Sequence, residues 1–306
     1  MLPTNLRYGS KVESAAARSV RSNIQPQNGT SGYNLGDTIT INVPTRSNLV
    51  MSPMDTYLKF DLAVNNTSGT AASYRWDSAG AHGLFQRIRV YSSSNLIEDN
   101  DNYNMLAKML FDLQVSTDAA YGKFNILAGC RNDLVVKPLT NITSSQDATI
   151  AYAAINNGAL SAYQCNSGES LNGKNTTNAD SASTVTNTYC LNLISIMDAL
   201  CQKQYFPLFA CTSSALRIEI QLVDSLPKAM LSTSAVGTIR LSNVEFVANN
   251  IELSDVAMGM ISQSLQGQPL QFVAPQWKNI PASQWPLNVN STTEISFPIA
   301  AKYSSL

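Results

Sequence analysis

The period that decides the fold is clearest in the stretch Leu216-Arg217-Ile218-Glu219-Ile220-Gln221-Leu222. Apolar and polar side chains alternate along it without a break. This period of two is typical of a β-strand that buries one face, whereas an amphipathic helix repeats its apolar residues at gaps of three and four. The stretch therefore predicts a half-buried strand with Leu216, Ile218 and Ile220 in the core.

The same alternation recurs along most of the chain. It is present at residues 37–44, 57–64, 84–91, 189–194, 238–247 and 295–299. Leu58 and Phe60 lie on the apolar face of the second run and are expected in the core. The alternation changes phase near Asn243, which predicts a β-bulge, and residues 51–55 are predicted to form a turn. Seven or more strands with long connections predict an all-β fold, a jelly-roll sandwich with Greek-key crossings.

One segment has the period of a helix. Its apolar residues recur at gaps of three and four, at Tyr103, Leu106, Leu110 and Leu113, and the stripe is widened by Met105 and Met109. Glu98, Asp99 and Asp101 come just before it, and negative charge is favourable at a helix N-terminus. We therefore expect one short helix among the strands, with the acidic residues at its start.

The composition along the chain predicts an arm followed by two jelly rolls. Residues 1–36 are weakly basic, contain Gly and Pro breakers, and form the arm. Residues 37–226 form the first jelly roll, and within them residues 141–188, rich in Ser, Thr and Asn, form a large surface excursion. Residues 227–306 are too few for eight strands with loops of any size. We expect the second jelly roll to be incomplete within this sequence and to be finished by further sequence or another chain, unless the subunit is a reduced one.

The chain is poor in charge. Charged residues make up 13% of it, about half of the ~25% typical of soluble proteins. Asn, Ser and Thr take their place, and these groups cost less to bury against a partner than charges do. Lys and Arg number 20 against 21 Asp and Glu, a formal net charge of −1, so dedicated genome wrapping is not expected. Without a signal peptide or a membrane-length apolar stretch, synthesis in the cytosol without secretion is expected.

Two patterns are similar to catalytic motifs, but neither has the context that the chemistry needs. Residues 168–174 match the G-x-x-x-x-G-K core of a phosphate-binding loop, but Asn175 stands where a hydroxyl should bind Mg²⁺, and loop-like sequence flanks the motif. Asp77, Ser78 and His82 are close in sequence, but catalytic triads form by convergence in space. His82 is interpreted as a loop residue without a special role, and no catalytic residue is predicted.

No metal or cofactor site is predicted either. Five cysteines are spaced too widely for a C-x-x-C pair and are interpreted as small buried hydrophobic residues: Cys130, Cys165, Cys190, Cys201 and Cys211. Residues 99–101 match the first ligands of a calcium loop, but Asn104 occupies the position that requires glycine. Arg87 and Arg89 share the polar face of their run, where salt bridges or subunit contacts are expected ahead of phosphate binding.

The order of these elements resembles that of the double jelly-roll major capsid proteins of tailless icosahedral DNA viruses. That lineage includes virophages, Polinton-like elements, giant-virus relatives and membrane-containing phages. In the first half, the resemblance is carried by the runs 37–44, 57–60 and 84–90, followed by Ile97-Glu98 and the helix. In the second half, it is carried by Phe206-Pro207-Leu208 before the strand 216–220, and by residues 244–253, which are similar to the start of the second jelly roll.

This resemblance implies a homotrimer whose six jelly rolls form a pseudo-hexagonal capsomer of an icosahedral shell. The partners would be other copies of the chain, minor capsid or penton proteins and, through the arm of residues 1–36, an internal membrane or the genome. The excursion of residues 141–188 would be a surface tower or a clasp between subunits. The chain would then be a virion protein, made in the host cytoplasm, with no enzymatic activity, no cofactor and no small-molecule substrate.

Two other classes of jelly-roll protein share some of these features. A carbohydrate-binding module, such as a receptor- or glycan-binding protein, would also be β-rich and poor in charge, and Trp277 and Trp285 are its candidate platform. A cupin-like enzyme needs several histidines for its metal, and this chain has one. The enzyme class is therefore disfavoured.

Overall fold

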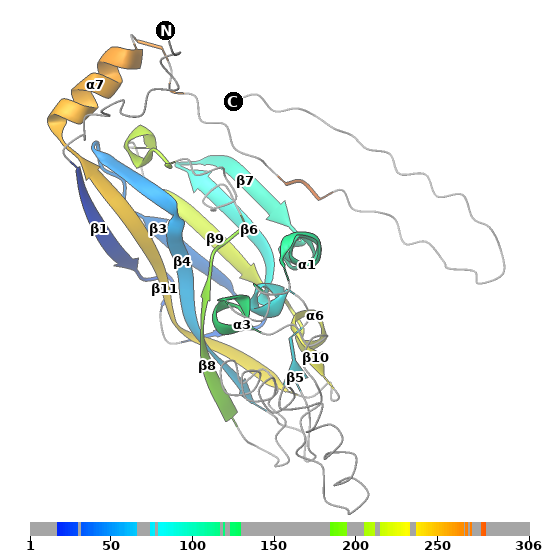
Figure 1. Ribbon diagram of the computed structural model, residues 1–306. Helices are drawn as coiled ribbons and strands as arrows, with labels where there is room; N and C mark the ends of the chain where they lie inside the picture. The colour runs from blue at the N-terminus through cyan, green and yellow to red at the C-terminus, as the bar shows by residue number, and fades with distance from the viewer. Residues whose placement is uncertain are drawn as a thin grey trace, which may run out of the picture.

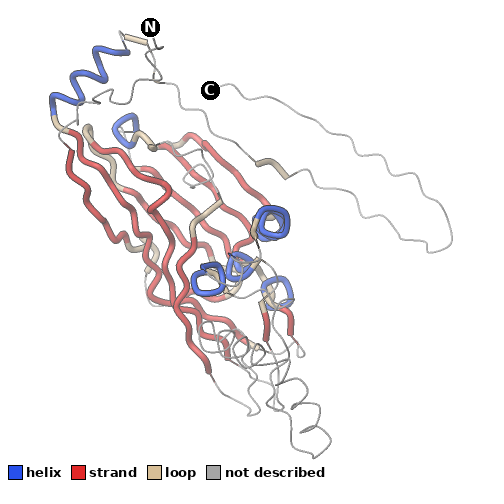
Figure 2. The backbone as a smooth tube through the Cα atoms, in the orientation of Figure 1, coloured by secondary structure: helices blue, strands red, loops and turns tan. Residues whose placement is uncertain are grey.

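The computed structural model shows a β-sandwich with short helices around it (Figure 1, Figure 2). The described residues are 17–29, 32–65, 74–76, 79–116, 119, 123–129, 184–194, 205–211, 215–232, 237–265, 267–268, 270 and 277–279. Within this part of the chain, none of the helices has the length and hydropathy of a membrane span.

Two antiparallel sheets make up the sandwich. The first contains, in spatial order, β1 (Ala17–Ile24), β11 (Thr238–Leu253), β4 (Leu49–Asn65) and β8 (Thr184–Leu191), with β2 (Tyr33–Asn34) also paired to β11. The second contains β3 (Thr38–Val43), β9 (Leu216–Leu222), β6 (Phe85–Ser92) and β7 (Asn95–Asp101). The buried side chains of the two sheets form one hydrophobic core.

The connections between the sheets define the topology. The first long strand, β1, pairs with the last, β11, while β6 and β7 in the middle of the chain form a hairpin. The chain crosses from one sheet to the other between β1 and β3, β3 and β4, β4 and β6, β7 and β8, β8 and β9, and β9 and β11. Eight strands arranged in this way form a jelly roll. The all-β class and the jelly-roll architecture expected from the sequence are confirmed.

The core follows the alternation of the sequence. Leu58 and Phe60 of β4 and Leu216, Ile218 and Ile220 of β9 are all buried, as predicted. Aromatic rings pack together in the core: the ring of Phe60 lies edge-on to that of Phe85 at 5.9 Å and is tilted against that of Tyr189 at 5.8 Å. These contacts join β4 and β8 of the first sheet to β6 of the second.

Two irregularities bend the long central strands β4 and β11. Asn243 has a φ of 50° and lies where two residues of β11 face one residue of β4, so the predicted bulge is confirmed. The turn predicted at residues 51–55 is wrong, because β4 continues through it. Residues 53–56 instead face Ala248 alone, in a wider bulge in which the Thr56 hydroxyl donates to the Ser52 carbonyl at 2.7 Å. A bulge accommodates Pro53, which has no N–H to donate to the ladder.

Strand pairing differs from two of the expected domain limits. The sequence predicts residues 17–24 in the arm and residues 238–253 in a second jelly roll. In the structure these residues form β1 and β11, which pair with each other over eight residues in one sheet. β1 escapes the alternation signal because its inward positions, Val20, Ser22 and Ile24, are only half-buried. Residues 184–188, assigned to the excursion, belong to β8. The rest of the excursion and the run at 295–299 lie outside the described residues, so the second jelly roll stays a prediction.

The predicted helix exists, but it begins later than expected. It is α1 (Tyr103–Gln114), and the acidic residues Glu98, Asp99 and Asp101 lie in β7 before it. β7 buries Glu98 and Asn100 where an ordinary strand buries apolar side chains, so its period of two is invisible in hydropathy. The apolar residues of the helix are not all buried. Tyr103 and Leu110 lie in the core, whereas the apolar residues on the other side of the helix are exposed.

Short elements complete the sandwich. β5 (Tyr74–Arg75) pairs with β10 (Leu231–Ser232). The helical segments are η2 (Gly80–Leu84), α3 (Lys123–Leu127), η4 (Leu208–Cys211), α6 (Leu226–Ala229) and α7 (Asp255–Leu265). In Figure 1, α1 and α3 flank the lower part of the sandwich, whereas α7 projects from its upper end.

Replacing Phe60 or Ile218 by Ala should lower the free energy of unfolding by about 2–5 kcal/mol, because each deletion leaves a cavity in the core. Chemical denaturation measures the change. Lys59→Ala is the matched control, since the Lys59 side chain is 41% exposed on the same strand as Phe60, and loss of its ion pair should cost less than about 1 kcal/mol. If both core variants unfolded at the same denaturant concentration as the parent, the register of these strands would be wrong by one residue.

Candidate functional site

The polar face of the second sheet carries paired charges. Arg87 donates two hydrogen bonds to the Asp99 carboxylate, at 2.7 and 2.6 Å. This guanidinium holds the pKa of Asp99 below its usual value. Arg89 lies 3.4 Å from Glu219 on the neighbouring strand. The salt bridges expected for both arginines are confirmed, and they occupy the groups that phosphate would need.

The described residues contain no group of three or more side chains suited to a metal ion. Residues 99–101 belong to a strand and do not form a calcium loop. Cys190 and Cys211 are half-buried free thiols, and burial raises the pKa of Cys190. The other three cysteines, the G-x-x-x-x-G-K match at 168–174, Asp77 and Ser78 lie outside the described residues.

His82 has a structural environment that its sequence context did not predict. It lies within η2 and is buried. Its Nδ1 is 2.9 Å from the Tyr103 hydroxyl, and its ring packs edge-on against Phe111 at 4.9 Å. Burial lowers the pKa of His82 from 6.5 to about 3, so the ring is neutral at physiological pH. The histidine therefore fastens η2 to α1.

This contact is one end of a buried polar chain that crosses three elements. The Tyr103 hydroxyl accepts the N–H of Ile194 at 2.9 Å. The Ile194 carbonyl in turn accepts from the Asn100 amide at 3.2 Å, and the same amide donates to Glu98 at 2.7 Å. Buried polar groups persist only when they are hydrogen-bonded, so this chain fixes α1, β7 and the segment after β8 relative to one another.

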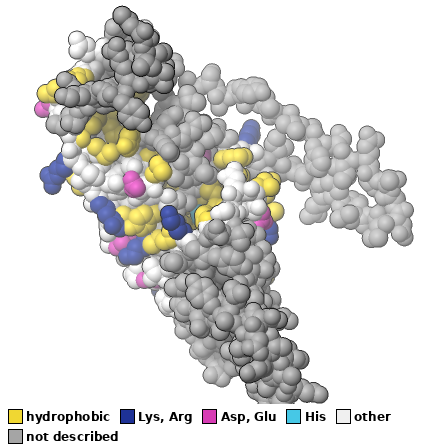
Figure 3. Space-filling view, in the orientation of Figure 1, with side chains coloured by type: hydrophobic (Ala, Val, Ile, Leu, Met, Phe, Trp, Pro, Cys, Tyr) yellow, Lys and Arg dark blue, Asp and Glu magenta, His cyan; other side chains and the backbone are white. Residues whose placement is uncertain are grey.

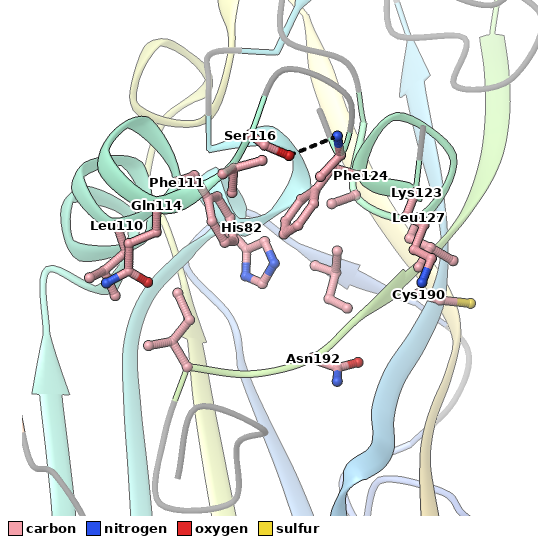
Figure 4. Close-up of a pocket in the computed structure, with 15 residues that line it drawn as sticks. His82, Leu110, Phe111, Gln114, Ser116, Lys123, Phe124, Leu127, Cys190 and Asn192 are labelled. Carbon is pink, nitrogen blue, oxygen red and sulfur yellow. Dashed lines mark hydrogen bonds between the residues drawn. The ribbon is translucent and has the colours of Figure 1, made fainter. Parts of the chain in front are cut away.

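A cavity of about 490 Å³ lies beside this chain (Figure 4). Helix α1 supplies Leu110, Phe111 and Gln114 to one side of it, and α3 supplies Lys123, Phe124 and Leu127 to the other. The end of β8 and the residues after it supply Cys190, Leu191, Asn192 and Ile194. His82 lies between Phe111 and Phe124 in Figure 4. No motif in the sequence marks the cavity, because its walls come from segments far apart in the chain.

The outer face of α1 exposes large apolar side chains. Met105, Met109 and Leu113 are 57%, 59% and 80% exposed. Their spacing of four residues places them on one side of the helix. Figure 3 shows hydrophobic side chains at the surface over this region of the molecule. We call these three residues the α1 patch.

The carbohydrate platform considered from the sequence is only partly visible. Trp277 is 40% exposed. Trp285 lies outside the described residues, so the pair cannot be placed together. A single exposed aromatic ring is common at protein surfaces and does not make a platform.

Comparison with known proteins gives matches among solved structures. No family model and no curated protein matches the sequence. The structure is similar to that of the Sputnik virophage, at 7% identity and a TM-score of 0.49, covering 83% of this chain and 51% of the other. It is also similar to the Faustovirus major capsid protein, at 9% identity and a TM-score of 0.44, covering 87% of this chain and 59% of the other. A third similar structure is that of the mavirus major capsid protein, at 8% identity and a TM-score of 0.38, covering 83% of this chain and 51% of the other.

Two of these three structures are those of major capsid proteins. At such identities the likeness concerns the fold alone. The chain spans about half the length of the solved proteins it matches.

The neutral state of His82 predicts a specific pH dependence. Between pH 6.5 and 3 the unfolded chain binds a proton at this residue and the folded chain does not. Its contribution to stability is therefore complete above pH 6.5 and is lost as the pH falls, by up to about 1.4 kcal/mol per pH unit. A His82→Phe variant keeps the aromatic contact and cannot titrate.

Chemical denaturation of both proteins at several pH values tests this prediction. The free energy of unfolding of the parent should fall relative to that of His82→Phe as the pH drops from 7 to 4. The comparison removes the contribution of the carboxylates, which both proteins share. A difference that stays constant over this range would show that His82 is not held neutral.

Proposed function

We propose that this chain is a structural capsid protein that assembles with copies of itself into trimeric, pseudo-hexagonal capsomers of an icosahedral shell. The observation that carries the proposal is the two-sheet jelly roll of eight strands, an architecture that serves viral capsids, lectins and cupins. Fold alone does not decide among these three functions. The surface and the sequence resemblance favour the first.

The surface supports self-association. A low charge content reduces the desolvation cost of an interface, and the α1 patch places three large apolar side chains in solvent. Because His82 and Tyr103 anchor the opposite face of the same helix, the patch is held rigidly. A rigid apolar surface loses little conformational entropy on binding. We propose that the α1 patch belongs to a contact between subunits.

The remaining elements of the proposal concern partners and location. The chain would be made in the host cytoplasm and reside in the virion, in contact with minor capsid or penton proteins. Residues 1–16 would face an internal membrane or the genome. A second jelly roll would follow α7, so that three subunits supply the six rolls of one capsomer. No step of this role requires a catalytic group or a cofactor.

The oligomeric state tests the proposal. Light scattering coupled to size-exclusion chromatography should show three chains per particle, and negative-stain electron microscopy should show three-fold particles with a hexagonal outline. A monomer at micromolar concentration that binds a glycan array would favour a carbohydrate-binding module instead.

Substitution in the α1 patch tests the contact itself. Leu113→Glu should shift the protein from trimer towards monomer, because a charge would have to be desolvated in the interface. Leu113→Met is the matched control, since it keeps the apolar surface, and it should remain trimeric. The dissociated variant should stay folded, with the circular dichroism spectrum of the parent, because Leu113 is 80% exposed and outside the core. A Leu113→Glu variant that stays fully trimeric would exclude the patch from the interface.

A further inference from the structure

The cavity beside His82 has a polarity gradient from its mouth to its floor. Its polar lining residues other than His82 are all exposed: Gln114, Ser116, Lys123 and Asn192. The residues buried at its floor are apolar except for His82: Leu110, Ala128, Leu191 and Ile194. The neutral ring of His82 is already bonded to Tyr103, so it adds no charge there. A ligand that matches this gradient has an apolar tail and a polar head.

The charge at the mouth selects the head group. Lys123 is the only charged side chain among the lining residues that the structure describes. It forms no ion pair with a described residue, unlike Lys59 and Lys228, which pair with Glu245 and Asp224. Among the described lining residues there is no Asp or Glu to repel an anion. An ammonium group at the rim of an apolar cavity is complementary to a carboxylate at the end of an alkyl chain.

The size of the cavity limits the tail. A methylene group takes up about as much space as a water molecule, ~30 Å³. A volume of about 490 Å³ therefore holds an alkyl chain of medium length. It lies within the range of cavities that bind small ligands, and its lining is mostly apolar with a few polar groups, as in such sites.

We propose that this cavity binds a free single-chain amphiphile with an anionic head, of the fatty-acid class, with its tail between α1 and α3 and its carboxylate at Lys123. The proposal does not depend on the capsid role, since every group it uses belongs to one chain. A ligand seated there would contact both helices and the end of β8. It would therefore stabilise the arrangement of α1 and the α1 patch.

Isothermal titration calorimetry with monomeric laurate, below its micelle concentration, tests the binding. Laurate should bind saturably at one site per chain and more tightly than dodecanol or dodecyltrimethylammonium, which carry the same tail with neutral and cationic heads. Lys123→Gln should weaken laurate binding about three- to fivefold, the size of one partly exposed ion pair, and remove its advantage over dodecanol. Lys278→Gln is the matched control, as Lys278 is exposed and does not line the cavity, and it should bind like the parent.

A second variant separates the cavity from surface adsorption. Ala119→Trp adds a large side chain to the cavity lining and should abolish laurate binding. Val256→Trp on α7 adds the same side chain at an exposed position outside the cavity and should leave binding unchanged. Circular dichroism confirms that both variants are folded.

Three outcomes would overturn the proposal. They are the absence of saturable laurate binding, equal binding by folded Ala119→Trp, and binding to phosphatidylglycerol vesicles without binding to monomeric laurate. The last would indicate a membrane surface in place of a cavity for a free amphiphile. Light scattering in the same samples keeps the tests apart, because a trimer that binds no laurate contradicts this inference and leaves the capsid proposal standing.

Discussion

The structure depends on the pairing of its first long strand with its last. β1 and β11 form an antiparallel ladder from Ala17 opposite Leu253 to Ile24 opposite Phe246. The short strand β2 pairs with β11 only at Arg240 and Leu241, so β1 makes the longer ladder on this side, while β4 occupies the opposite edge. Contacts between residues so far apart in sequence form only after the intervening chain is placed, and they are slow to form for that reason. Closure of the sandwich therefore requires nearly the whole described sequence.

A second constraint holds the two sheets together. Phe60 contacts Phe85 across the two sheets and Tyr189 within its own sheet, and the Trp76 indole N–H donates to the Tyr189 hydroxyl at 3.1 Å. Burial raises the pKa of Tyr189, so this hydroxyl stays neutral. Gly129 has a φ of 105° and lies so close to the Trp76 ring that a Cβ there would clash with it. The segment that leads from α3 is thereby packed against the same aromatic cluster.

Most of this fold could be predicted from the sequence, because a strand with one buried face reveals itself by its period. β3, β6 and β9 were found in this way, and Asn243 marked its bulge by a shift of phase. β7 could not be predicted because its buried positions are the polar residues Glu98 and Asn100, which are joined by a hydrogen bond and give no apolar alternation. The cavity could not be predicted, since α1, α3 and the residues at the end of β8 that line it are brought together only by the tertiary fold.

The buried polar chain, which could not be predicted from the sequence, is physically linked to the α1 patch. A helix whose apolar residues face in all directions could rotate to bury its methionines and leucine against the sheet. The hydrogen bonds of Tyr103 to His82 and Ile194 forbid that rotation, because turning α1 would leave three buried polar groups without partners. Each such loss costs about 1–3 kcal/mol, which is comparable to the gain from burying one large apolar side chain. The buried chain thus keeps Met105, Met109 and Leu113 exposed on the outer face of α1, where they are available to a partner subunit.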